Sequence, residues 1–304
     1  MLDTLRSAVR ARLLRAVAEA TAPSATALAG QLEAVRAELG RLGDRLGAID
    51  AGLRQELAAW ERRQRRDMLT AADWDAMRTS AAWLGRELDG AVPHFHKHDT
   101  LRAALAAAPA SGLYLEFGVA SGSTLRLISE AAPAGTVYGF DCFDGLPEYW
   151  RLGFTAGTFA TAQLPDVPGA ELVVGLFDET LPGFLGEHPE PVAFLHLDAD
   201  LYSSTVTVLR ALAPRLQAGT VIVFDEYFNF PGWQDHEHRA WTEFVADTGL
   251  QFEHLGFTAD DEQLSLRLLT APRTTPVPAT VQDGGAARAV SAGHRRAVSA
   301  GAAR

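Results

Sequence analysis

Residues 192–200 of the chain read VAFLHLDAD, a mostly apolar run that ends in two aspartates. A second run, residues 220–226, reads TVIVFDE and also ends in acidic residues. The segment between the two runs has the apolar spacing of a helix and is closed by Gly219. A strand–helix–strand unit of this kind makes its two strands parallel neighbours in one sheet. We therefore expect both acidic clusters at one carboxyl edge of the sheet, where open α/β folds bind their ligands.

Four carboxyl groups belong to these clusters: Asp198, Asp200, Asp225 and Glu226. Carboxylates crowded at one sheet edge repel each other unless a cation or a shared proton relieves them. Oxygen ligands of this kind are the ones that hard divalent cations such as Mg²⁺ prefer. The pattern therefore predicts an enzyme that holds a hard divalent metal.

The rest of the region 110–270 alternates strand and helix patterns. Alternation at this spacing predicts an α/β fold, namely a doubly wound, Rossmann-like, seven-stranded and mainly parallel sheet with helices on both faces. The last strand alternates apolar and polar residues, which predicts an edge or half-exposed position. Strands are expected near 113–117, 136–141, 170–174, 192–198, 219–225, 251–257 and 263–269, and helices near 122–132, 179–186, 202–215 and 234–247.

Residues 1–66 are expected to be helical. Residues 1–20 form a basic amphipathic pattern, which suits either packing or contact with a membrane surface. From Leu28 to Leu53 the apolar residues recur at alternating spacings of three and four, as in a coiled coil. Four glycines interrupt this run, and each costs up to about 1 kcal/mol of helix stability. We expect self-association through these heptads to give a homo-oligomer; the alternative is one long helix folded back on the catalytic domain.

The flanks of the catalytic region are less informative. Residues 67–109 are expected to form a helical lid or cap. Within them, His94, His96 and His98 alternate, and we expect a polar loop there rather than a metal site. Residues 271–304 are rich in Ala, Pro, Thr, Gly and Arg, repeat the phrase RAVSAG, and are predicted to be a disordered tail.

Composition excludes several classes of function. The 304 residues carry a net charge of −11, and residues 67–270 alone carry 10 basic against 29 acidic side chains, a net of −19. Such a field repels phosphate backbones, so nucleic acid is not an expected substrate. No apolar run reaches the length that spans a bilayer. The single cysteine suits a reducing compartment, and we expect a cytoplasmic protein.

A glycine turn follows the first strand of the catalytic region. Residues 113–124 read LYLEFGVASGST, in which Gly118 and Gly122 allow a tight turn and the following helix offers free amides. The spacing is not that of the dinucleotide motif, and no phosphate-binding loop with lysine follows. The turn therefore disfavours NAD and ATP and leaves other nucleoside cofactors open.

Three further residues suit a nucleoside. Asp141 ends the next strand, about 20 residues after the turn, where a carboxylate can accept hydrogen bonds from both ribose hydroxyls. After the third strand, Phe177 can stack on an adenine and Asp178 can bond its exocyclic amine. Asp178 is equally suited to be the N-cap of a helix that begins at Glu179.

Taken together, these stretches resemble the class I S-adenosylmethionine-dependent O-methyltransferases, most of all the macrocin O-methyltransferase family of sugar-methylating enzymes. The resemblance covers about residues 110–270. It rests on EFGV at 116–119 with Gly122 and Ser123, FDCFDGLPE at 140–148, HLDADLY at 196–202, DEY at 225–227 and PGW at 231–233.

The resemblance implies a set of cofactor residues and a metal. Glu116, Gly118, Ser121, Gly122 and Ser123 would surround the methionine end of S-adenosylmethionine, with Asp141 at the ribose and Asp178 near the adenine. In the metal-dependent branch, which includes the catechol O-methyltransferases, Mg²⁺ lies on acids that match Asp198, Asp225 and Glu226.

One departure from the catechol enzymes concerns the base. Those enzymes place a lysine three residues after the first metal acid, where this chain has Leu201, and the only lysine, Lys97, is far away in sequence. Asp200 is the base expected here, because it lies two residues beyond Asp198. The alternative is His236 or His238, since histidine titrates near neutral pH.

The expected activity is therefore Mg²⁺-dependent transfer of a methyl group from S-adenosylmethionine to a hydroxyl of a small molecule or glycan, with a sugar as the favoured acceptor. Two alternatives remain. Enzymes similar to cephalosporin hydroxylase share the scaffold and its acids, and a non-catalytic protein could use the heptads to recruit a partner.

Overall fold

The computed structural model describes residues 2–273; most of the expected tail, residues 274–304, lies outside the described residues. The chain divides into two compact units. One contains Met1–Glu87 with Asn229–Gly232, and the other contains Leu88–Phe228 with the residues from Trp233 onward. Over the described residues, no helix combines the length and the apolar character needed to cross a membrane.

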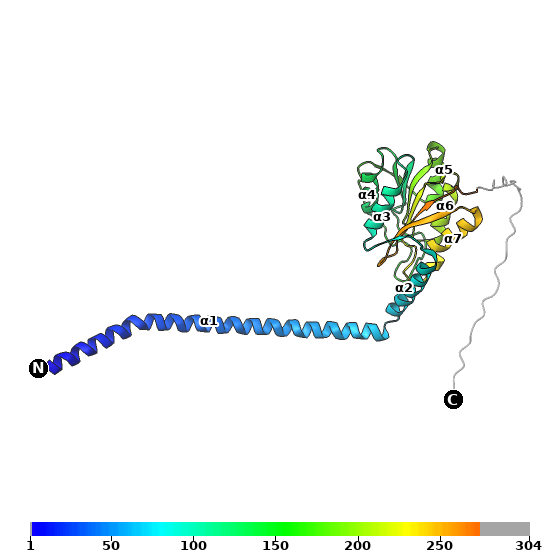
Figure 1. Cartoon of the computed structure of the whole chain (residues 1–304). Helices are drawn as coiled ribbons and strands as arrows, with labels where there is room; N and C mark the ends of the chain where they lie inside the picture. Colours follow the sequence, from blue (N-terminus) through cyan, green and yellow to red (C-terminus); the bar gives the residue numbers. More distant parts are fainter. Residues whose placement is uncertain (1, 274–304) are drawn as a thin grey trace, which may run out of the picture. The chain divides into compact units, whose positions relative to one another are not determined.

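The first unit consists mainly of two helices, α1 (Leu2–Arg66) and α2 (Met68–Glu87). The expected amphipathic helix and the heptad segment join into the single helix α1, which Figure 1 shows as one continuous element. Its apolar stripe is exposed: Leu39, for example, retains 62% of its accessible surface. The coiled coil itself stays a prediction, because it requires a second helix.

The second unit is built on one sheet, in which the strands lie in the order β1-β7-β8-β6-β5-β2-β3-β4. β8 is antiparallel to both of its neighbours, and the other pairs are parallel. The expected Rossmann-like, mainly parallel sheet is confirmed. The strands are β1 (Val92–His94), β2 (Leu113–Phe117), β3 (Val137–Asp141), β4 (Ala170–Val174), β5 (Val192–Leu197), β6 (Val221–Phe224), β7 (Phe252–Thr258) and β8 (Leu264–Leu268).

The sheet has eight strands, so the prediction of seven was wrong. The additional strand, β1, pairs with β7 and ends at His94, where a polar loop was expected within the helical segment 67–109. With three residues and no buried side chain, β1 leaves no alternation in the sequence that could reveal it. The unit that contains the sheet therefore begins at Leu88, well before residue 110.

The position expected for the last strand was also wrong. β8 lies inside the sheet, between β6 and β7, and not at an edge. Its polar residue Ser265 is buried, because its hydroxyl donates to the carbonyl oxygen of Gly256 at 2.9 Å. A buried polar side chain that bonds to the backbone thus produces the same alternation of apolar and polar residues as a half-exposed strand.

Helices cover both faces of the sheet, as predicted. Figure 1 shows α3 and α4 on one side and α5, α6 and α7 on the other. Their bounds, with two 3₁₀ turns, are α3 (Lys97–Ala107), α4 (Ser123–Ala131), α5 (Phe177–Glu187), α6 (Tyr202–Leu212), η1 (Ala213–Arg215), η2 (Trp233–Asp235) and α7 (Glu237–Thr248).

The centre of the sheet positions the site. β5 is buried along its whole length, and β2 lies beside it with β3 on the far side. The connections run outward in opposite directions from β2 and β5, which makes this the switch point of the sheet. In open α/β folds, ligands bind outside the carboxyl ends of the strands at that point.

Candidate active site

The glycine turn after β2 brings the ends of two strands together. The Gly118 amide donates to the Phe140 carbonyl at 2.9 Å, and the Asp198 amide donates to the Phe117 carbonyl at 2.9 Å. Gly118 has φ +94°, and a Cβ built on it would lie 1.8 Å from the carbonyl oxygen of Asp198. Only glycine therefore allows β2 and the first acidic residue after β5 to approach this closely.

Asp141, at the end of β3, stabilises the same turn. One carboxylate oxygen accepts hydrogen bonds from the Val119 and Ala120 amides at 2.9 Å each, and the other accepts from the Phe143 amide at 2.7 Å. A carboxylate offers about four acceptor positions. Asp141 thus keeps about one position for a ligand hydroxyl while it fixes the loop.

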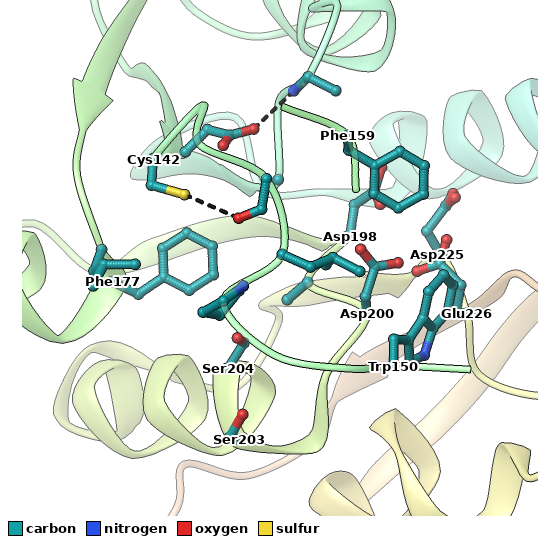
Figure 2. A pocket seen from close by; sticks show the side chains of 18 of the residues that line it. Cys142, Trp150, Phe159, Phe177, Asp198, Asp200, Ser203, Ser204, Asp225 and Glu226 are labelled. Carbon is teal, nitrogen blue, oxygen red and sulfur yellow. Dashed lines mark hydrogen bonds between the residues drawn. The ribbon is translucent and has the colours of Figure 1, made fainter. Parts of the chain in front are cut away.

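A cavity of about 650 Å³ opens at this edge of the sheet (Figure 2). In Figure 2 the acidic residues gather on one side of the cavity, beside Trp150 and Phe159, and Phe177 lies on the other side. The predicted site residues at its wall are Gly118, Asp141, Phe177, Asp178, Asp198, Asp200, Asp225 and Glu226.

The remaining predicted residues lie elsewhere. Glu116 is completely buried in β2, and Gly122 is buried at the start of α4 with φ +74°. Ser121 and Ser123 are exposed. His236 is half-buried just before α7, with its ring 6.5 Å from that of Trp150. These five residues are not at the cavity wall.

The structure excludes one of the two roles expected for Asp178, that of the N-cap. Helix α5 begins at Phe177, two residues earlier than expected, and its N-cap is Leu176. Asp178 is therefore not the N-cap and faces the cavity. Phe177 packs edge-on against Phe117, with ring centroids 5.2 Å apart.

Three carboxyl groups converge at the other end of the cavity. One oxygen from each of Asp198, Asp200 and Glu226 lies within 4.8 Å of the other two. Asp200 has φ +59°, an uncommon conformation for a residue other than glycine. The Oε2 atom of Glu226 is buried and has no hydrogen-bond partner within the part of the chain that the structure describes. We call these three residues the acidic triad.

The triad is electrostatically unbalanced. Burial, together with the charge of Asp225, raises the pKa of Asp198 well above its usual value. Burial and the charge of Asp198 do the same to the pKa of Glu226. The pKa of Asp200 rises to about 7, mainly through burial, although Arg151 opposes the shift. The three groups thus resist ionisation together unless a cation joins them.

Asp225 differs from the triad because it is flanked by cations. The Lys97 ammonium lies 3.4 Å from its Oδ2 atom, and Nε2 of His196 lies 3.6 Å from its Oδ1 atom. Burial alone would raise the pKa of Asp225, but the hydrogen bond with His196 and the charges of His196 and Lys97 outweigh it and lower this pKa.

His196 is a buried histidine in β5 with charged partners on both sides. Its Nδ1 atom lies 2.9 Å from the Oε1 atom of Glu116. Burial would lower the pKa of His196, but hydrogen bonds with Asp225 and Glu116 outweigh it and raise this pKa to about 10. The imidazolium therefore links the two carboxylates through the centre of the sheet.

Two residues at this site escaped the sequence analysis. Lys97 reaches the cluster although 128 residues separate it from Asp225, and its being the only lysine was the one available signal. Glu237 is completely buried at the start of α7, and its carboxylate accepts a hydrogen bond from the Glu226 amide at 3.1 Å. It fixes the backbone of the second acidic cluster.

Comparison with known proteins agrees with this geometry. A family model described as a methyltransferase domain matches residues 115–227. No curated protein matches the chain.

Several solved structures are similar to part of the chain. CalS11, a calicheamicin methyltransferase, is 28% identical over 57% of this chain and 80% of its own, with a TM-score of 0.44. The O-methyltransferase NovP is 23% identical over 56% and 76%, with a TM-score of 0.42. An O-methyltransferase from Bacillus cereus is 14% identical over 69% and 96%, with a TM-score of 0.40.

The matched region contains the glycine turn, Asp141 and both acidic clusters, which are the parts that the strand order brings to one cavity. Residues 115–227 of this chain therefore match a methyltransferase domain, on a sheet with the strand order of a Rossmann-like fold.

Proposed function

We propose that the protein is a Mg²⁺-dependent O-methyltransferase that acts on a hydroxyl group of a sugar. The observation that carries the proposal is the acidic triad at the wall of the same cavity that begins at the glycine turn. A metal site next to a methyl donor is the arrangement expected where a bound hydroxyl must be oriented and made more acidic.

The two ends of the cavity suggest how the cofactor is held. Phe177 and Asp178 support an adenine site, and the remaining acceptor position of Asp141 supports a ribose site. Gly118 allows close approach of the backbone between them. Glu116, Ser121, Gly122 and Ser123 remain proposed for the methionine end on the family resemblance. When bound, S-adenosylmethionine supplies an electrophilic methyl group on a sulfonium.

The triad fits Mg²⁺ in its chemistry. All of its ligand atoms are carboxylate oxygens, and the buried Oε2 atom of Glu226 has no other partner among the described residues. Mg²⁺ binds through a few carboxylates and keeps positions for water and substrate oxygens. When bound, the ion would lower the pKa of a coordinated hydroxyl. Asp198 and Glu226 are in the set expected from the resemblance, and the geometry adds Asp200.

The reaction itself needs few groups. The acceptor oxygen forms a bond to the methyl carbon while the carbon–sulfur bond breaks and its electron pair remains on sulfur, which leaves a neutral thioether. The hydroxyl proton passes to a base. Asp200 is the proposed base, because it lies at the cavity wall and can turn one oxygen to the metal and the other to the acceptor. His236 lacks this position.

The substitution Asp200→Asn is therefore expected to lower kcat by about 10²–10³-fold, within the range typical of a lost general base. His236→Gln is the matched control, because it changes a titratable side chain near the cavity, and we expect a change of less than about threefold. Steady-state kinetics with saturating Mg²⁺ compares the two variants. A larger loss in His236→Gln than in Asp200→Asn would assign the base to histidine.

The acceptor is proposed from the cavity wall and the family resemblance. Trp150, Phe154 and Phe159 line the same cavity as the triad, and aromatic faces suit sugar rings. Two neighbouring sugar hydroxyls could reach one metal together. A glycoside, glycan or natural product is thus the proposed acceptor class.

The decisive experiment is a screen of sugar acceptors with labelled S-adenosylmethionine, with Mg²⁺ and with a chelator. A product heavier by one CH₂ group supports methyl transfer, and a product heavier by one oxygen supports the hydroxylase alternative. The all-carboxylate triad favours the first outcome, because non-haem iron oxygenases use two histidines and one carboxylate. Full transfer in the chelator would contradict the metal role.

We also propose that α1 self-associates and that the protein acts in the cytoplasm as a homo-oligomer. The apolar stripe from Leu28 to Leu53 is exposed at a strict heptad spacing, which is too narrow for ordinary globular packing. In a parallel, in-register pair, Arg45 of one copy would face Asp50 of the second copy across the seam. This charge complementarity favours a second copy of the chain as the partner that covers the apolar stripe.

Leu39→Glu combined with Leu46→Glu should reduce the particle mass in light scattering to that of one chain, 32.6 kDa. Buried charges at these positions would oppose pairing. Ala37→Glu with Ala48→Glu is the matched control, because it adds the same charge to exposed positions off the stripe and should leave the mass unchanged. Equal masses in all three proteins would refute self-association through the stripe.

A further inference from the structure

The N-terminal part of α1 carries positive charge that the helix does not balance. Residues 4–18 contain no acidic residue and four arginines, namely Arg6, Arg10, Arg12 and Arg15. Further along the same helix, arginines pair with acids three or four residues away, as Arg36 does with Glu33 and Arg54 with Asp50. Among the side chains that the structure describes, no carboxylate lies within ion-pair distance of the four N-terminal arginines. Their charge is therefore available to a partner.

Two of these arginines share a face of α1 with apolar side chains. At 3.6 residues per turn, positions 6, 10, 13 and 17 lie within about 60° of one another around the helix axis. This face, which we call the basic groove, has a volume of about 500 Å³ and is lined by Arg6, Val9, Arg10, Leu13, Leu14 and Val17. Leu13 and Leu14 each retain 62% of their accessible surface. The groove thus presents guanidinium groups and exposed apolar side chains to the same partner.

A second copy of the chain does not match the basic groove. In the parallel, in-register pair proposed for the stripe from Leu28 to Leu53, the arginines of one copy would face the same arginine-rich segment of the other. That segment has no acidic residue between positions 4 and 18, and like charges brought together across an interface oppose association. Pro23 also lacks the amide that would bond to the Glu19 carbonyl, so one helix hydrogen bond is missing between the groove and the stripe. The pairing proposed for the stripe therefore does not extend to the groove.

The partner of the groove must cover apolar side chains and supply negative charge. Nucleic acid or a polyacidic peptide would bind the guanidinium groups but would leave Leu13, Leu14 and Val17 in water. The surface of an anionic bilayer provides both parts, because headgroup phosphates accept hydrogen bonds from arginine and the acyl chains lie directly beneath them. Arginine can bury its methylene groups beside apolar side chains and keep its charge at the headgroups. Basic amphipathic helices bind membrane surfaces in this way.

We propose that the basic groove docks on an anionic lipid bilayer, with residues 6–17 of α1 lying in the plane of the membrane surface. This inference goes beyond the proposed function and holds or fails separately from it. The part of α1 that follows Val17 spans roughly 70 Å, and charges are screened over about 8 Å at physiological ionic strength. The net charge of −19 in residues 67–270 is therefore compatible with an anionic surface at the N-terminal end of the helix.

The test is flotation of the full chain with lipid vesicles. Vesicles with about one third phosphatidylglycerol carry an anionic surface, and vesicles of phosphatidylcholine alone do not. We expect the protein to float with the anionic vesicles and to bind the neutral ones at least about thirtyfold more weakly, because each arginine near an anionic surface contributes to binding. Salt at about 0.5 M should release most of the protein, since the screening length falls to about 4 Å.

Two double variants test the two parts of the groove. Arg6→Gln with Arg10→Gln removes two positive charges and should weaken binding to the anionic vesicles by about thirtyfold. Leu13→Gln with Leu14→Gln removes apolar surface that enters the bilayer boundary, and it should weaken binding by about thirtyfold as well. Both parts are expected to matter because the groove uses charge and apolar contact together.

Each variant has a matched control in α1. Arg36→Gln with Arg41→Gln makes the same charge change at arginines that pair with Glu33 and Glu38. Ala8→Gln with Ala11→Gln adds two glutamines at exposed positions on the opposite side of the helix from the groove. Both controls should change binding by less than about threefold, and circular dichroism should show the same helix content in all four variants.

Several outcomes would overturn the inference. One is equal binding to anionic and neutral vesicles, or binding to neither. Another is a groove variant that loses no more binding than its matched control. Binding of polyglutamate or duplex DNA in place of vesicles would assign the arginines to another partner. A lower particle mass in light scattering without lipid, when Leu13→Gln is combined with Leu14→Gln, would assign the groove to a second copy. Product mass in the acceptor screen is independent of these results, so their failure leaves the methyltransferase proposal in place.

Discussion

Asp198→Asn is expected to remove most methyl transfer and at the same time to stabilise the metal-free protein. Loss of a metal ligand removes several kcal/mol of transition-state stabilisation, so kcat/KM should fall by about 10²–10³-fold. Burial and the charge of Asp225 raise the pKa of Asp198, which means that its ionised form opposes folding at neutral pH. The neutral amide should therefore raise the melting temperature, by about 2–4 °C for each kcal/mol of repulsion relieved.

Asp225→Asn provides the matched control, with the opposite sign for stability. It removes one negative charge from the end of β6. At this position, however, the carboxylate balances the positive charges of Lys97 and His196. Removing one member of a buried ion pair typically costs about 3–5 kcal/mol, because the other charge is left without a partner. Calorimetric melting of both variants in a chelator makes the comparison. A melting temperature that falls equally in both would show that the two carboxylates have the same electrostatic role.

Much of this site was predictable because its parts follow apolar strands directly. β2, β5 and β6 are continuous buried runs that end in glycine or acidic residues, and parallel strands bring those ends to one edge. The two acidic clusters and Asp141 follow from this rule alone. The pairing of the strands is enough to bring these residues together around one cavity. No other long-range contact is required.

What the sequence did not reveal depends on contacts between distant segments. Lys97 reaches Asp225 only because the three-residue strand β1 adds to β7, and a strand this short leaves no pattern. The choice between Asp200 and Asp225 as third triad member depends on the positive φ of Asp200 and on the two cations beside Asp225. Neither feature is encoded by the spacing of the acids.

The same reasoning explains where pattern analysis failed inside the sheet. Ser265 and Arg267 gave β8 the alternation of an edge strand. In the structure the Ser265 hydroxyl is buried with the Gly256 carbonyl, and Arg267 pairs with Glu253 at 3.1 Å on the neighbouring strand β7. Polar residues that find partners on an adjacent strand can occupy the interior of a sheet.

Gly118→Ala is expected to be the most damaging single change in the domain. The new Cβ would lie 1.8 Å from the Asp198 carbonyl oxygen, and backbone cannot move aside as a flexible side chain can. Alanine at φ +94° adds a conformational cost of about 1–3 kcal/mol, and the steric clash adds about 1–3 kcal/mol more. Because Asp198 carries a triad oxygen, its displacement should also weaken Mn²⁺ binding in the fraction that folds.

Gly135→Ala isolates the steric part of this effect. Gly135 also has a left-handed backbone, with φ +76°, but a Cβ there would meet no atom within 4 Å. It should therefore cost only the conformational strain, about 1–2 kcal/mol, and leave Mn²⁺ affinity unchanged. Urea unfolding of the two variants measures the difference, and metal binding at low urea measures the coupling to Asp198. If Gly118→Ala lost no more stability than Gly135→Ala, the close approach of β2 and β5 would not be what shapes the site.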